Sequence, residues 1–169
     1  MYFTFNDIDE ITENLYLGDL SGAENIEKLK LFDIKKVLSL LNGYFPQYNS
    51  SDNIIHKTLN VNDFDEENII KHFGECLNFI KGEDKILVHC AAGASRSASI
   101  VIAYIMWNKK MPFKEALEFV QSKRNIVCPN PGFKDQLQLF EKLLNENNYD
   151  IDKIKFDEIK WEPKKYYYF

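Results

Sequence analysis

Apolar and polar residues follow one another along the chain in blocks that predict strands and helices in turn. Short apolar runs bounded by turn residues predict strands at Asn14–Gly18, Lys36–Leu41, Ile54–Val61 and Lys85–His89. Apolar residues three or four positions apart predict helices at Ala23–Phe32, between Ile69 and Ile80, at Ser99–Asn108, and after Pro112 and Pro131. This order is typical of an α/β domain with a central, mostly parallel sheet of about five strands flanked by helices on both faces. Ligands of such sheets bind beyond the carboxyl ends of the strands.

The last part of the chain follows a different pattern. No repeat or flexible linker divides residues 1–145, so we expect them to form one domain. From residue 146 the chain becomes rich in asparagine and then places apolar residues among charges, at Ile151, Ile154, Phe156, Ile159 and Trp161. We expect residues 146–169 to form a tail that packs on the domain. A tail that binds a partner or becomes phosphorylated is the alternative.

Composition narrows the class of protein. The 169 residues are 45% hydrophobic and 28% charged, as in ordinary globular domains, and the net charge of -5 argues against a nucleic-acid partner. No apolar stretch approaches the ~20 residues that span a bilayer, so no membrane contact is expected. Three cysteines and a start without a secretory signal predict a reducing compartment. We expect a cytoplasmic protein, with the nucleus as a second location.

The residues that suggest chemistry lie where the strand Lys85–His89 ends. They are His89, the run Cys90 to Arg96, here called the cysteine loop, and Ser97. Five small residues let this backbone curl into a concave nest, whose N–H groups and following helix suit a phosphate. Arg96 would add two parallel hydrogen bonds to phosphate oxygens, which lysine cannot reproduce. The predicted phosphate-binding residues are Ala91, Ala92, Gly93, Ala94, Ser95 and Arg96.

Cys90 is the predicted nucleophile, because N–H dipoles, a helix start and a guanidinium together favour its thiolate form. The thiolate would attack a bound phosphoryl group and form a cysteinyl phosphate. The expelled oxygen needs a proton, and the polar cluster Asn62–Glu67, called the acidic loop below, supplies Asp63 as catalytic acid with Asp65 in reserve. Ser97 is placed to hydrogen-bond the departing thiolate. No metal or other cofactor is required.

Other residues have simpler explanations. His89 is predicted to fix the cysteine loop and tune Cys90 rather than to shuttle protons. His72 and Cys76 have the spacing of one helical turn that a zinc site uses, but no second ligand pair accompanies them. We therefore expect these two side chains in the core or on the surface.

These residues resemble the dual-specificity phosphatases, a family of cysteine-dependent protein tyrosine phosphatases marked by His-Cys, five residues, Arg and then Ser or Thr. The likeness covers residues 10 to 145 and includes the opening strand Asn14–Gly18, the acid region Val61–Asp63, and Ala94–Ser97 followed by Ala103–Met106. Asn130–Phe133, with Gln136-Leu137 and Phe140-Glu141, is similar to the closing helix of the family.

The resemblance implies a small, atypical member with a bare catalytic domain and a shallow pocket for phosphotyrosine, phosphoserine and phosphothreonine. It also implies that Asn130 braces the cysteine loop by hydrogen bonding. Because it places Cys128 near this loop, a reversible disulfide with oxidised Cys90 is an open alternative. The uncharged Ala91, Ala92 and Ala94 argue against a phosphoinositide, since lipid-directed relatives carry lysines there.

Two classes of function compete. The first is an enzyme that hydrolyses phosphate monoesters on proteins, acting as a monomer in signalling. The second is a phosphate-binding pseudoenzyme or scaffold that captures a phosphorylated partner. Catalysis is favoured because a binding protein gains nothing from Cys90 and Asp63. A third possibility is the same hydrolysis on a non-protein substrate, namely an RNA 5′-phosphate, a phosphoinositide or a phosphoglycan.

Overall fold

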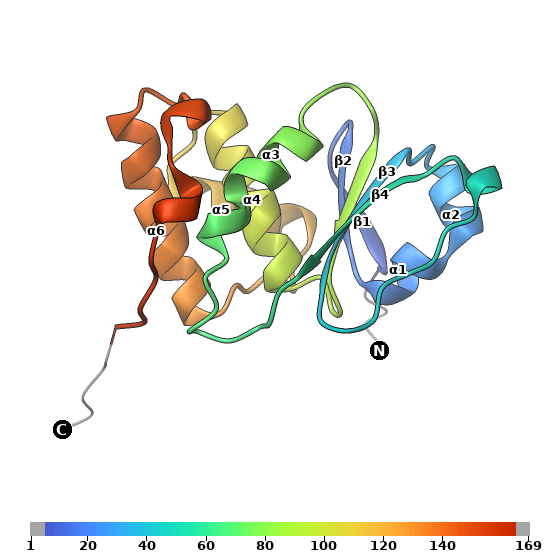
Figure 1. Cartoon of the computed structure of the whole chain (residues 1–169). Coiled ribbons are helices and arrows are strands. Elements are labelled where there is room, and N and C mark those ends of the chain that lie inside the picture. Colours follow the sequence, from blue (N-terminus) through green and yellow to red (C-terminus); the bar gives the residue numbers. More distant parts are fainter. Residues whose placement is uncertain (1–5, 165–169) are drawn as a thin grey trace.

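A five-stranded sheet forms the centre of the molecule (Figure 1), in a computed structural model that describes residues 6–164. The strand order is β1-β2-β5-β3-β4, and all neighbours are parallel except the antiparallel edge pair β1 and β2. The bounds are β1 Ile8–Thr12, β2 Leu15–Gly18, β3 Lys36–Leu41, β4 Ile55–Asn60 and β5 Ile86–His89. The predicted mostly parallel sheet is confirmed.

Helices cover both faces of this sheet, as predicted. Figure 1 shows the two short helices α1 Leu20–Glu24 and α2 Ile26–Leu31 on one side and the four longer helices on the other. The longer helices are α3 Phe73–Ile80, α4 Arg96–Asn108, α5 Phe113–Lys123 and α6 Pro131–Glu146. Single turns of 3-10 helix complete the fold, at η1 Ser50–Asp52, η2 Ile70–His72, η3 Ile151–Lys153 and η4 Phe156–Glu158.

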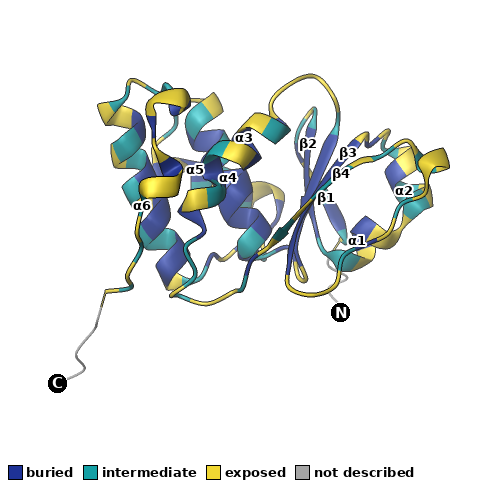
Figure 2. Ribbon diagram, in the orientation of Figure 1, coloured by how far each residue is buried: buried dark blue, intermediate teal, exposed yellow. Residues whose placement is uncertain are grey.

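The core lies in two layers, one on each face of the sheet (Figure 2). The larger layer is centred on α4, which is buried on nearly all sides, as its uniformly apolar sequence predicts. Because α4 begins directly above the carboxyl end of the middle strand β5, the packing of this helix fixes the cysteine loop between two rigid elements.

The structure corrects three details of the predicted elements. The edge strand β1 was not predicted, because its sequence Ile-Asp-Glu-Ile-Thr is half acidic and polar. The single helix expected at Ala23–Phe32 is two helices, since the Asn25 side chain accepts the Lys28 N–H and begins a new helix there. The central helix begins at Arg96 rather than Ser99.

Residues 147–164, called the C-terminal segment below, run back along the four-helix face. Ile151, Ile154 and Phe156 are buried in the same apolar layer as α4 and α6. In the part of the chain that the structure describes, no helix is both long and apolar enough to cross a bilayer.

Candidate active site

Cys90 lies at the carboxyl end of the middle strand, where the topology gathers the ends of β3, β4 and β5 at one edge of the sheet. Its side chain is 2% exposed. The Cys90 Sγ accepts hydrogen bonds from the Gly93 N–H at 3.2 Å and from the Ser97 hydroxyl at 3.1 Å. Ser97, the predicted partner of the departing thiolate, therefore does contact Cys90.

The carbonyl groups of residues 91 to 94 all accept hydrogen bonds from groups outside the cysteine loop. The donors are Leu20 N–H to Ala91, Arg124 Nη2 to Ala92, Arg124 Nε to Gly93, and Cys128 N–H to Ala94, at 2.8 to 3.2 Å. Within residues 6–164, the backbone N–H groups of Ala91, Ala92, Ala94, Ser95 and Arg96 donate to no protein group. The carbonyl oxygens of the loop are thus hydrogen-bonded, while its N–H groups stay free, as in a nest that binds a tetrahedral anion.

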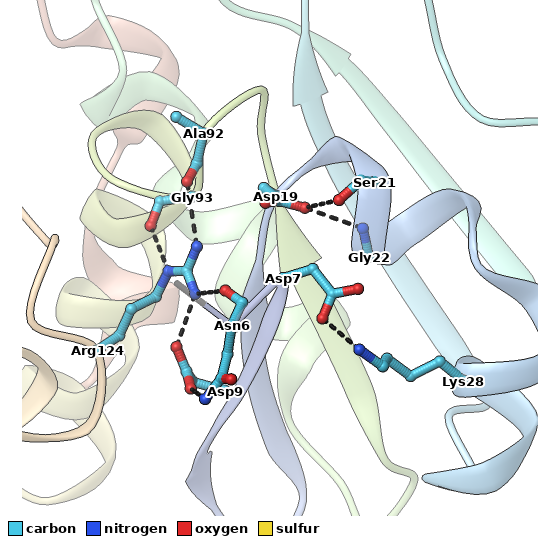
Figure 3. A network of polar contacts seen from close by, with 10 residues as sticks. All are labelled: Asn6, Asp7, Asp9, Asp19, Ser21, Gly22, Lys28, Ala92, Gly93 and Arg124. Atoms are coloured by element: carbon cyan, nitrogen blue, oxygen red, sulfur yellow. Dashed lines mark hydrogen bonds and ion pairs between the residues drawn. The ribbon is translucent and has the colours of Figure 1, made fainter. Parts of the chain in front are cut away.

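Arg124, at the end of α5, holds the cysteine loop from behind (Figure 3). Its guanidinium is almost fully buried and binds both the Ala92 and Gly93 carbonyls while pairing with Asp9 at 2.6 Å. A buried charge of this kind needs such partners, because burial removes its hydration. The sequence did not reveal this residue, since nothing in it pairs Arg124 with Asp9, 115 positions away.

Gly93 occupies a position that only glycine fits. Its φ of 67° is in the left-handed region, and a Cβ there would lie 2.5 Å from the Gly18 carbonyl oxygen. Gly18 is paired with His89 in the sheet, so the cysteine loop is pressed directly against the neighbouring strand β2.

Arg96 joins the cysteine loop to the start of the acidic loop. One terminal nitrogen, Nη1, donates to the Val61 carbonyl at 3.1 Å. The Nε atom is buried and has no hydrogen-bond partner in the described structure. An unpartnered buried guanidinium N–H costs free energy unless a ligand accepts it, and Arg96 directly follows the small residues of the cysteine loop. This arrangement fits the predicted phosphate clamp.

Asp63 lies against the cysteine loop, whereas Asp65 does not. The Asp63 Oδ1 accepts the Ser95 hydroxyl at 2.7 Å and the Asn130 side-chain amide at 2.9 Å. Asp65 instead binds the Gly132 N–H on α6, at 3.4 Å. Asn130 also caps α6 and donates its backbone N–H to the Ser95 hydroxyl. Asn130 therefore links the two loops, and of the two carboxylates only that of Asp63 accepts a hydrogen bond from the cysteine loop.

His89 lies fully buried behind the cysteine loop. Its Nδ1 donates to the Cys90 carbonyl at 3.1 Å, so Nε2 of the neutral ring accepts the Ser39 hydroxyl at 2.5 Å. His56 contacts the same hydroxyl at 2.7 Å. Burial lowers the pKa of His89 to about 4, which keeps the ring uncharged and suited to positioning rather than to proton transfer.

Of the remaining predicted groups, Cys128 lies beside the cysteine loop, to which its backbone N–H donates, whereas Cys76 and His72 lie elsewhere. His72 binds Glu75 at 2.9 Å, while Cys76 is fully buried in the core, where desolvation raises the pKa of its thiol. Cys128 is exposed, and all three cysteines are free.

Comparisons with known proteins agree with this geometry. Residues 15–143 match the family model described as "Dual specificity phosphatase, catalytic domain". The chain is 39% identical over 145 residues to "Dual specificity protein phosphatase 1B" of Arabidopsis thaliana, covering 83% of this chain and 86% of the relative. The solved structure of the human tyrosine phosphatase-like serine/threonine/tyrosine-interacting protein is similar, at a TM-score of 0.76 and 34% identity, covering 82% and 97% of the two chains. The solved structure of DUSP15 is similar at a TM-score of 0.74 and 32% identity, covering 82% of this chain and 95% of that chain.

Proposed function

The chain belongs to the dual specificity phosphatase family of cysteine-dependent protein phosphatases, and on that premise we propose that it hydrolyses phosphotyrosine and phosphoserine or phosphothreonine through a cysteinyl phosphate. The observation that carries the proposal is the cysteine loop, where free N–H groups and the unpartnered Arg96 Nε surround a sulfur that accepts two hydrogen bonds. This set matches a phosphate bound directly above a nucleophile.

In the first step, the Cys90 thiolate attacks phosphorus, the S–P bond forms and the P–O bond to the leaving group breaks. The leaving oxygen takes a proton from the Asp63 carboxylic acid. In the second step a water attacks phosphorus and gives a proton to the Asp63 carboxylate. The S–P bond breaks, and the Ser97 hydroxyl donates to the thiolate that leaves. The nest and Arg96 hold the phosphoryl oxygens throughout.

Protein substrates are favoured over polyanionic ones by the surroundings of the loop. The exposed side chains of the cysteine loop, Ala91 and Ala92, are uncharged, and the whole chain carries a net charge of -5. A phosphoinositide headgroup or an RNA end brings further phosphates that need cationic partners. A phosphorylated side chain brings one phosphate, which the nest and Arg96 match.

Kinetics on small substrates test the proposal. Wild-type protein should hydrolyse aryl phosphates and single phosphotyrosine, phosphoserine and phosphothreonine peptides, with vanadate as inhibitor. Cys90→Ser should abolish turnover, and Asp63→Asn should lower kcat by about 10²-fold while phosphate still binds. Preferred release of phosphate from RNA 5′-ends, phosphoinositides or phosphoglycans would overturn the substrate class, and a large effect of Asp65→Asn instead would overturn the assignment of the acid.

A phosphate-binding protein without turnover is the second candidate, favoured by one comparison. The human structure at a TM-score of 0.76 is named a phosphatase-like interacting protein. Tight binding of a phosphopeptide by reduced wild-type protein, without any release of phosphate, would establish that function in place of the enzyme.

A further inference from the structure

The C-terminal segment contacts the acidic loop although it lies beyond residues 15–143, the part that matches the family model. The indole N–H of Trp161 donates to the backbone carbonyl of Asp65 at 2.8 Å, across 96 positions of sequence. The side-chain amide of Asn68, just after the acidic loop, donates to the Ile159 carbonyl at 2.8 Å. One hydrogen bond therefore joins the C-terminal segment to the acidic loop, and a second joins it to the residue that follows this loop.

The C-terminal segment is itself fixed to the domain. Phe156 is 8% exposed and packs on α3 so closely that a Cβ on Gly74 would lie 2.6 Å from its ring. The same ring meets Phe140 of α6, with centroids 6.0 Å apart. At the start of the segment, the Trp107 indole donates to the Tyr149 carbonyl at 3.0 Å. A segment fixed in this way can hold the acidic loop in place.

The tip of the acidic loop is exposed to solvent, although Asp63 accepts hydrogen bonds there from Ser95 and Asn130. Asp63 is exposed and Phe64 is 63% exposed. The loop is also held by α6, through the Gly132 N–H to the Asp65 carboxylate and through the Gln136 side chain to the Glu67 carbonyl at 2.8 Å. Asp65, two residues from Asp63, is thus bound both by α6 and by Trp161.

We propose that Trp161 is a positioning residue for the acid Asp63, so that the C-terminal segment sets the efficiency of proton transfer to the leaving group. This inference rests on the proposed phosphatase function. Without the indole N–H, the Asp65 carbonyl loses its partner and the acidic loop samples positions in which Asp63 leaves Ser95 and Asn130. Within residues 6–164 no hydrogen bond joins Trp161 to the cysteine loop, so phosphate binding and attack should be unchanged.

Two substrates separate these effects in the full-length protein. Phenyl phosphate has a poor leaving group that needs a proton, and 2,4-dinitrophenyl phosphate has one that departs without it. In Trp161→Phe, which keeps an aromatic ring and loses the N–H, kcat/KM for phenyl phosphate should fall by about 3- to 10-fold, the effect of one hydrogen bond. For 2,4-dinitrophenyl phosphate the change should stay below about 2-fold.

Trp107→Phe is the matched control, because it loses an indole hydrogen bond of the same kind at the other end of the C-terminal segment. It should change neither substrate by more than about 2-fold. In an Asp63→Asn background, Trp161→Phe should have no further effect, since the group that it positions is gone. Amide hydrogen exchange at residues 63–67 should be faster in Trp161→Phe and unchanged in Trp107→Phe.

The outcomes distinguish the two proposals. Equal losses on both substrates, or a loss that persists in the Asp63→Asn background, would assign Trp161 a purely structural role and overturn the inference alone. Unchanged kinetics and exchange would overturn it as well. Absence of hydrolysis by the reduced wild-type protein would overturn the proposed function, and with it the inference.

Discussion

The cysteine loop and the acidic loop meet through Asp63, Ser95 and Asn130, yet the fold supports them in different ways. The cysteine loop is short, lies between a buried strand and a buried helix, and has four consecutive carbonyls bound by fixed donors. The acidic loop has an exposed tip and is held at separate points by α6 and the C-terminal segment. An anion site needs one fixed geometry, whereas a proton donor needs only to reach the leaving group.

The difference implies that damage to the two loops can be told apart. A distorted cysteine loop should impair every substrate and weaken vanadate binding, because attack and phosphate binding depend on the same N–H groups. A displaced acidic loop should impair only substrates whose leaving group needs a proton.

The largest effect is expected for Arg124→Met. This change leaves the Asp9 carboxylate and two loop carbonyls without their partner, so the free energy of unfolding should fall by about 3–5 kcal/mol in urea unfolding. The kcat/KM of both aryl phosphates should fall together, by about 10²-fold or more. Arg124→Lys keeps the positive charge but lacks the planar guanidinium. Its free energy of unfolding and its kcat/KM should lie between those of the wild-type protein and those of Arg124→Met. A loss of kcat/KM confined to phenyl phosphate would contradict the assignment of Arg124 to the support of the cysteine loop.

Gly132→Ala tests the other loop, with a smaller expected effect. A Cβ at this buried position would lie 2.2 Å from the Asp65 carbonyl oxygen, so the acidic loop must shift. The kcat/KM for phenyl phosphate should fall by about 10-fold, while that for 2,4-dinitrophenyl phosphate and inhibition by vanadate stay nearly unchanged. Weaker vanadate inhibition would mean that the two loops are not separable.

The smallest effect concerns pH, through His89 behind the cysteine loop. Its folded-state pKa of about 4 lies below the unfolded value of ~6.5, so the unfolded chain binds the extra proton in that window and stability falls as pH falls. Between pH 7 and 5 this contributes about 2 kcal/mol of lost stability. Urea unfolding of His89→Gln should show a loss smaller by about that amount, and equal losses in both proteins would contradict a neutral, buried His89.

The cysteine loop could be proposed from the sequence, because the predicted nucleophile, the small loop residues and Arg96 are contiguous and their spacing has a direct physical meaning. Asp63 could be proposed ahead of Asp65 from its place after a strand, but its contacts with Ser95 and Asn130 could not be foreseen. Arg124 and Trp161 could not be found, since their roles depend on pairing across 115 and 96 positions that no local pattern records.

The most direct test of the account is to isolate the phosphorylated cysteine. In Ser97→Ala the leaving thiolate loses the hydroxyl that donates to it at 3.1 Å, so the intermediate should break down slowly and accumulate. Acid quenching of this variant during turnover of 2,4-dinitrophenyl phosphate, followed by peptide mass spectrometry, should find one phosphoryl group on Cys90. Turnover with no phosphoryl group on Cys90, or with one on another residue, would contradict the proposed mechanism.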